Sequence, residues 1–174
     1  NSIAGVVNVP GTAIGLSIIT VIGRCMGAGE TGQAAHYTKR LVGAGYVFML
    51  VMGTGMFLFA DTLVSWFNLT PQAVQMAGQV LRACAVGNVL FWPMAFTLPN
   101  SLRAAGDAVF TMGVSLCSMF ACRVALSYVM ACEWGLGLGL LGVWLAMIAD
   151  WVARAVLFFV RYRQGKWKKI KVIG

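Results

Sequence analysis

The chain has 174 residues, of which 60% are hydrophobic and 10% are charged, and its formal net charge is +8. A soluble domain is about 45–50% apolar and about 25% charged. The 13 basic and 5 acidic side chains could not cover the surface of a soluble fold this apolar. The composition therefore excludes an ordinary soluble domain and predicts an all-α integral membrane protein.

Long apolar runs recur along the chain and are separated by short polar segments. A helical run of about 20 residues crosses the ~30 Å hydrocarbon core of a bilayer. The sequence therefore predicts five transmembrane helices, at about residues 1–22, 41–60, 80–98, 108–131 and 138–160, followed by a basic tail over residues 161–174.

The polar segment over residues 23–40 contains a Gly-x-Gly-x-x-Gly sequence that begins at Gly27, a formal match to a dinucleotide-binding motif. We reject this match because the preceding apolar run is too long for a strand and no acid follows about 20 residues later. We expect instead that Gly27 and Gly29 end the first helix. A short interfacial helix over residues 31–40 is then expected, with Thr31 as its N-cap.

A short polar elbow, Leu102-Arg103-Ala104-Ala105-Gly106-Asp107, separates the third and fourth predicted helices. An Arg and an Asp beside a Gly are typical of a membrane surface, because charged groups are costly inside the hydrocarbon. The elbow therefore predicts the reversal of a helical hairpin.

Basic residues alternate between the connections. The segment 23–40 has three, 61–79 has none, 99–107 has one, 132–137 has none, and the tail 161–174 has six. The positive-inside rule then places the C-terminus in the cytoplasm and the N-terminus outside. A basic tail beside an apolar helix indicates contact with anionic membrane lipid, and we expect no nucleic-acid partner.

Three stretches resemble the C-terminal half of the multidrug and toxic compound extrusion (MATE) transporters. The first is residues 21–39, with Gly27-Ala28-Gly29-Glu30 and Ala34-Ala35. The second is the elbow at 102–107, which continues into Phe110-Thr111-Met112, and the third is residues 137–167. Together they cover nearly the whole chain, and their combination is more specific than any single stretch.

The resemblance implies a fold of twelve helices in two six-helix lobes around a central cavity. Members of that family export cationic and amphipathic drugs by alternating access, in exchange for Na⁺ or H⁺. Residues 1–174 would form helices eight to twelve of such a multi-pass protein of the cell membrane. Five helices with an external start, and a first residue that is Asn, lead us to expect a fragment without the N-terminal lobe and one further helix.

No cofactor or metal is expected beyond the coupling ion. The resemblance implies a carboxylate in the helix that matches residues 80–98 of sodium-coupled relatives, but no Asp or Glu occurs between Thr62 and Ser101. Coupling is therefore expected to depend on the absent N-terminal lobe or on Asp150.

Several polar, aromatic and Met side chains are candidates for the wall of a substrate cavity. Broad specificity needs adaptable apolar walls with few polar anchors. Pro93 is expected to kink the third helix, and Trp92 beside it could stack on a planar cation. The alternative for each residue is ordinary packing. The candidates are Asn8, Asn88, Phe91, Trp92, Met94 and Phe96.

Asp150 is the carboxylate deepest in a predicted helix, about 18 Å from the start of that helix. Arg154 follows four residues later on the same face, in the favourable order for a helical ion pair. Arg123 on the preceding helix lies at a depth within reach. Asp150 is therefore either a structural counter-ion for these cations or the coupling-ion site. We favour the structural role because a carboxylate beside a guanidinium is already electrostatically occupied.

Two other function classes are weaker. A flippase for lipid-linked sugars, from the same superfamily, would need several cations at membrane depth, where only Arg82, Arg123 and Arg154 qualify. A membrane-embedded enzyme would need a catalytic constellation, which a single His and one central Asp do not provide. We therefore expect a transporter and no catalytic residues.

Overall fold

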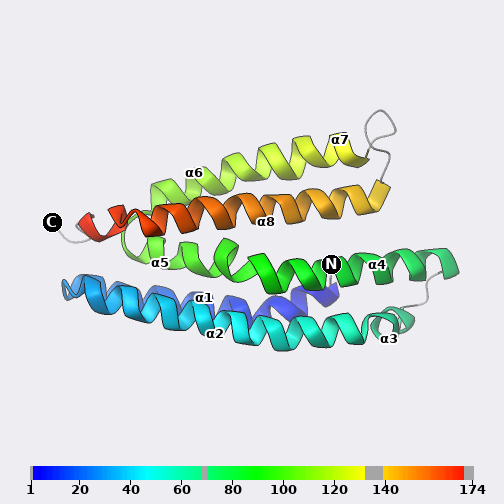
Figure 1. Cartoon of the computed structure of the whole chain (residues 1–174), viewed down its shortest axis with the longest axis horizontal. Coiled ribbons are helices and arrows are strands. Elements are labelled where there is room, and N and C mark those ends of the chain that lie inside the picture. The colour runs from blue at the N-terminus through cyan, green and yellow to red at the C-terminus, as the bar shows by residue number, and fades with distance from the viewer. Residues whose placement is uncertain (1, 68–69, 132–138, 171–174) are drawn as a thin grey trace.

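The computed structural model describes residues 2–67, 70–131 and 139–170, and this part of the chain is helical with no strand (Figure 1). The elements in chain order are α1 Ser2–Gly27, α2 Thr31–Leu58, α3 Ala60–Ser65, α4 Pro71–Trp92, the π-helical η1 Pro93–Thr97, α5 Leu98–Ala104, α6 Ala108–Ser118, the π-helical η2 Met119–Leu126, α7 Ser127–Ala131, α8 Gly139–Arg163, and the 3-10 helix η3 Lys166–Lys169.

The helices run roughly side by side along the long axis of the molecule (Figure 1). The α1–α2 hairpin forms one side, α6–α7 and α8 form the other, and α4–α5 lies between them. Five helical segments of the described chain are long and apolar enough to cross a membrane, which confirms the predicted fold class. They are Gly5–Gly27, Thr31–Leu58, Pro71–Ala104, Ala108–Ala131 and Gly142–Arg163.

The segment 31–40 does not form the separate interfacial helix that we predicted. Residue 31 begins α2, which continues to Leu58, and Glu30 rather than Thr31 occupies the N-cap position. The segment is rich in helix formers such as Gln, Ala, Lys and Arg. It also presents Ala34, Thr38 and Val42 as one buried face that continues into the span. Nothing in this sequence therefore ends the helix at the membrane surface.

The predicted connection over residues 61–79 is also mostly helical. It contains all of α3 (Ala60–Ser65) except its first residue, and the first nine residues of α4, which begins at Pro71. Proline is favourable in the first turn of a helix because its missing N–H has no intrahelical acceptor there. Arg82 of α4 forms an ion pair with Asp61 of α3, at 2.6 Å, and so joins the two helices at their exposed surfaces.

The predicted elbow is confirmed as a tight reversal between α5 and α6. Gly106 has a φ of +91°, a left-handed conformation that favours glycine. Its N–H donates to the Arg103 carbonyl at 3.0 Å, and the Asp107 N–H donates to the Leu102 carbonyl at 2.9 Å. The same Schellman pattern closes α1, with Gly29 at a φ of +77°. The turn predicted at 132–137 lies outside the described residues.

Asp107 also connects the elbow to the other end of the chain. Its carboxylate accepts hydrogen bonds from Arg161 Nε at 2.7 Å and Arg161 Nη2 at 3.1 Å. The Arg161 guanidinium lies 4.5 Å from the centre of the Phe110 ring. Residues 161–163 therefore belong to α8 rather than to the tail that we predicted, because the elbow supplies a partner for Arg161.

Two apolar cores hold the helices together. The first lies near the elbow and includes Ile18, Ile22, Leu102, Phe158 and Trp167 among its buried residues. The second packs α4 against α8 and α2. Large apolar side chains also point outward, as the exposed fractions of 81% for Val109 and 76% for Trp66 show. Such a surface fits a lipid environment.

The α1–α2 turn, the elbow and η3 gather at one end of the bundle, which we call the basic end (Figure 1). The α3 segment lies at the opposite end. We predict that cysteines introduced by Ser65→Cys and Ala108→Cys in a cysteine-free, full-length protein react with an impermeant maleimide from opposite faces of the membrane. Ala108→Cys should react from the cytoplasm, because residue 108 follows the elbow at the basic end and the positive-inside rule places that end in the cytoplasm. Labelling of both positions from one face would contradict the five-span topology.

Candidate functional site

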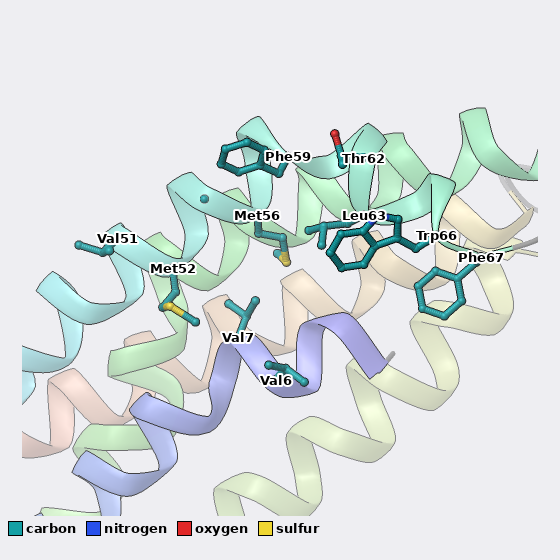
Figure 2. A pocket seen from close by; sticks show the side chains of 11 residues that line it. Val6, Val7, Val51, Met52, Met56, Phe59, Thr62, Leu63, Trp66 and Phe67 are labelled. Carbon is teal, nitrogen blue, oxygen red and sulfur yellow. The ribbon is translucent and has the colours of Figure 1, made fainter.

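An apolar cavity of about 470 Å³ opens between α1, α2 and α3, at the end opposite the basic end. Among the described residues, no charged side chain lines it. Its lining is Val6, Val7, Val51, Met52, Gly55, Met56, Phe59, Thr62, Leu63, Trp66 and Phe67 (Figure 2). Met and aromatic side chains are polarizable, and Met adapts readily to different shapes, which suits the binding of varied apolar molecules.

The local sequence explains why these side chains converge. Val51, Met52, Gly55, Met56 and Phe59 recur at helical spacing, so they share one face of α2 and its C-terminal end. The short helix α3 then turns back and adds its own apolar face over the same space (Figure 2). A Cβ atom at Gly55 would meet no atom within 4 Å, so this glycine leaves the wall open.

A second cavity, of about 550 Å³, lies between α2 and α8 at the basic end, and we call it the basic cavity. Met94 of η1 and Leu98 of α5 contribute to its wall. Of the residues that the structure describes, Lys39, Arg163 and Lys168 are its charged lining residues, and no carboxylate is among them. The two cavities therefore differ in electrostatic character.

The six residues predicted for a substrate cavity do not come together in either of the two cavities described above. Trp92 is only 5% exposed and stacks on Phe96, with ring centres 5.3 Å apart. Phe96 in turn meets the edge of Trp151 at 6.2 Å, and Phe91 packs in the same core. Only Met94 lines either of the two cavities described above. The predicted stacking of Trp92 on a substrate stays a prediction, because here Trp92 is packed inside the bundle.

Asn8 and Asn88 lie among the helices with unpartnered amide oxygens. Asn88 is fully buried, and its amide nitrogen lies 3.8 Å from Cys84 Sγ. Neither Asn8 Oδ1 nor Asn88 Oδ1 has a hydrogen-bond partner in the described part of the chain. A buried amide oxygen without a hydrogen bond destabilises an apolar interior. Both positions therefore favour a polar partner from beyond the described part of the chain.

The predicted ion pair between Asp150 and Arg154 is present, with Arg154 Nε 2.9 Å from Asp150 Oδ1. Asp150 is fully buried, and Arg154 is 8% exposed. The Ser118 hydroxyl donates to the same carboxylate oxygen, and Arg154 Nη2 donates to the Ser115 carbonyl at 3.2 Å. The cluster therefore ties α6 to α8.

Arg123 does not join this cluster, contrary to our expectation. It lies five residues beyond Ser118, which displaces it by about 7 Å along the helix, away from Asp150. Its side chain is exposed, and it forms no ion pair with any described residue. The sequence did not reveal Ser118, because hydroxyls are scattered along this helix and only the packing selects one of them.

Five packed apolar helices with cavities between them define a multi-pass membrane protein. The MatE family model matches residues 1–129, so the chain belongs to the MatE family of membrane transporters, and the resemblance seen in the sequence is confirmed. The family indicates a transporter rather than an enzyme. No group of His, Cys, Asp and Glu in the described segments could hold a metal ion.

Two curated relatives match nearly all of the chain. It is 27% identical over 164 residues to the probable multidrug resistance protein NorM of Thermotoga maritima, covering 94% of this chain and 35% of that protein. The chain is also 31% identical over 161 residues to the uncharacterized transporter YisQ of Bacillus subtilis. That match covers 90% of this chain and 34% of YisQ. The chain therefore spans about a third of the length of these relatives. No solved structure matches it.

We predict that Asp150→Asn lowers the stability of the full-length protein by about 3–5 kcal/mol, because it leaves the Arg154 charge buried without a counter-ion. Arg154→Gln added to Asp150→Asn should restore part of that loss, and thermal unfolding of the purified protein measures the coupling. Ser118→Ala keeps the ion pair and should cost only about 1 kcal/mol. Normal stability of Asp150→Asn would contradict the structural role.

We predict that Trp92→Ala lowers the yield of folded protein, because removal of a buried indole costs about 3–5 kcal/mol. A methyl group at Gly11 would overlap the Trp92 ring, so the two residues fit closely. Trp92→Phe should recover part of the yield, measured by size-exclusion chromatography. An unchanged yield with an altered range of transported compounds would instead support the substrate contact.

Proposed function

We propose that the protein is a cation-coupled antiporter that exports amphipathic or cationic small molecules by alternating access. The observation that carries this proposal is the MatE match over residues 1–129. The Thermotoga maritima relative, named as a probable multidrug resistance protein, supports the same class of substrate.

The apolar cavity supports this substrate class. Its volume of about 470 Å³ falls within the range typical of sites for drug-sized molecules. Phe59, Trp66 and Phe67 offer ring faces that attract a cation without a fixed counter-ion. Because no charged group fixes the position of a ligand, the cavity would select by shape and polarizability rather than by one defined ion pair.

The π-helical segment Pro93–Thr97 supports the conformational part of the proposal. It interrupts the long helix Pro71–Ala104, and Pro93 has no N–H to donate to a backbone hydrogen bond of the helix. Helices bend most readily where a backbone hydrogen bond is missing. The two halves of this helix could therefore tilt against each other as the protein changes the side from which it is accessible.

We propose that the coupling ion, Na⁺ or H⁺, binds away from Asp150. One oxygen of that carboxylate already accepts from Arg154 and from Ser118. A carboxylate that is already paired with a guanidinium binds a second cation only weakly. Ion coupling would then depend on groups beyond this cluster.

The flippase alternative gains no support from the described cations. Arg154 is paired with Asp150 and Arg82 is paired with Asp61. Arg123 is exposed, on a different helix from either. They do not converge on one cavity that could hold a pyrophosphate.

Reconstituted full-length protein provides the test. Liposomes with a higher Na⁺ or H⁺ concentration inside should take up ethidium as the ion leaves, and collapse of the gradient should stop the uptake. The ion that drives the exchange identifies the coupling. Movement of a fluorescent lipid-linked sugar, with no ethidium exchange under either gradient, would overturn the proposal in favour of a flippase.

We predict that Gly55→Phe reduces ethidium exchange at least about tenfold, because the added ring fills the open wall of the apolar cavity without a backbone clash. Gly23→Phe is a matched control, since a Cβ at Gly23 also meets no atom within 4 Å and this residue lines neither cavity. Equal exchange by the two variants, at equal protein levels, would exclude the apolar cavity as the substrate site.

A further inference from the structure

The basic cavity changes character along its depth. Lys39, Arg163 and Lys168 lie where α2 begins and α8 ends, close to the surface of the basic end. Tyr46 and Met94 line the cavity deeper within the bundle. Seven residues separate Lys39 from Tyr46, or about 10 Å along the helix. The cavity is therefore cationic at its mouth and mostly apolar inside.

The three cations of the mouth lack protein counter-ions within the described residues. The described ion pairs join Asp61 to Arg82, Asp150 to Arg154 and Asp107 to Arg161, and none reaches this cavity. Three like charges that share one mouth repel one another, and an anion between them would relieve this repulsion.

Aromatic contacts shape the wall of the mouth. The Arg163 guanidinium lies 5.8 Å from the centre of the Phe159 ring, and the Lys168 ammonium lies 5.5 Å from that of Trp167. Trp167 is 2% exposed and stacks on Tyr162. The Tyr162 hydroxyl donates to the Ala35 carbonyl of α2 at 3.3 Å. These contacts hold the cationic side chains of α8 and η3 beside α2.

We propose that the basic cavity is a binding site for an anionic phospholipid. The phosphate would lie between Lys39, Arg163 and Lys168, and an acyl chain would follow the apolar wall of Val42, Met94 and Leu98. Lysine and arginine donate charge-assisted hydrogen bonds to phosphate oxygens. Basic pockets between transmembrane helices on the cytoplasmic side are suited to such headgroups. This inference does not depend on the transported substrate.

The cationic mouth and the apolar interior of the basic cavity together favour a lipid over a free anion. A small anion would use the three cations alone, whereas a phospholipid also fills the apolar part of the 550 Å³ space. The apolar cavity at the other end has no lining cation, so it offers no comparable headgroup site.

Native mass spectrometry of the full-length protein in detergent tests the proposal, with dioleoyl phosphatidylglycerol and dioleoyl phosphatidylcholine as probes. We expect phosphatidylglycerol to bind about a hundredfold more tightly, because it is net anionic, whereas the choline ammonium of phosphatidylcholine offsets its phosphate and would be repelled by the three cations. Inorganic phosphate at the same concentrations should not compete. Equal affinity for the two lipids, or full competition by inorganic phosphate, would overturn the proposal.

The charged mouth is tested by the triple variant Lys39→Gln, Arg163→Gln and Lys168→Gln, which should lose the preference for phosphatidylglycerol. A matched control removes three exposed cations of the same end that do not line the cavity, by Arg24→Gln, Arg40→Gln and Lys166→Gln. The control should keep the preference. An equal loss in both would show only a general attraction of lipid to a basic surface and would refute a defined site.

Gly43→Phe tests whether the apolar interior of the basic cavity holds an acyl chain. A Cβ at Gly43 meets no atom within 4 Å, so the new ring would enter the cavity. We expect phosphatidylglycerol affinity to fall at least about tenfold, with thermal stability in detergent unchanged. Gly55→Phe, which fills the other cavity, is the control and should bind normally. Unchanged lipid affinity of Gly43→Phe would show that no acyl chain lies in the basic cavity and would overturn the proposal.

Discussion

Backbone hydrogen bonding in hydrocarbon is the constraint on which this structure depends. A peptide group that loses its partner in a lipid environment costs several kcal/mol, so an apolar chain must cross as continuous helices. The reversals at Gly29 and Gly106 therefore occur between helices, where Schellman hydrogen bonds satisfy the last carbonyls. The segment 31–40 extends α2 for a different reason, since its helix-forming residues and the buried face of Ala34, Thr38 and Val42 continue into the span.

Charged side chains inside the bundle also need hydrogen-bond partners. Asp150 Oδ1 accepts from Arg154 and from Ser118, and the Ser115 carbonyl accepts from Arg154 Nη2, so these contacts link α6 and α8. The atoms that stay unpartnered in the described segments are mostly neutral, such as Asn88 Oδ1, with Asp150 Oδ2 as the exception. The Asp150–Arg154 pair lies within α8, and its hydrogen bonds to Ser118 and to the Ser115 carbonyl connect α8 to α6.

Features carried by local spacing were predictable from the sequence. The five spans follow from apolar runs, the elbow from Gly106, and the pair of Asp150 with Arg154 from a spacing of four residues. Features that join distant segments were not predictable. The partnership of Asp107 with Arg161 and the convergence of α1, α2 and α3 on one cavity depend on how helices pack. Helix ends were misplaced because polar residues at a membrane surface do not interrupt a helix.

The difference in charge between the two ends supports our proposal that the two cavities bind different ligands. A cation that entered the basic cavity would meet Lys39, Arg163 and Lys168 with no carboxylate in the lining. Repulsion by three like charges is strong where water is partly excluded. The apolar cavity imposes no such barrier, because its lining within the described segments holds no charged residue. If the protein exports cations as we propose, these charges would keep them out of the basic cavity, and an anionic lipid bound there would not compete with them for the apolar cavity.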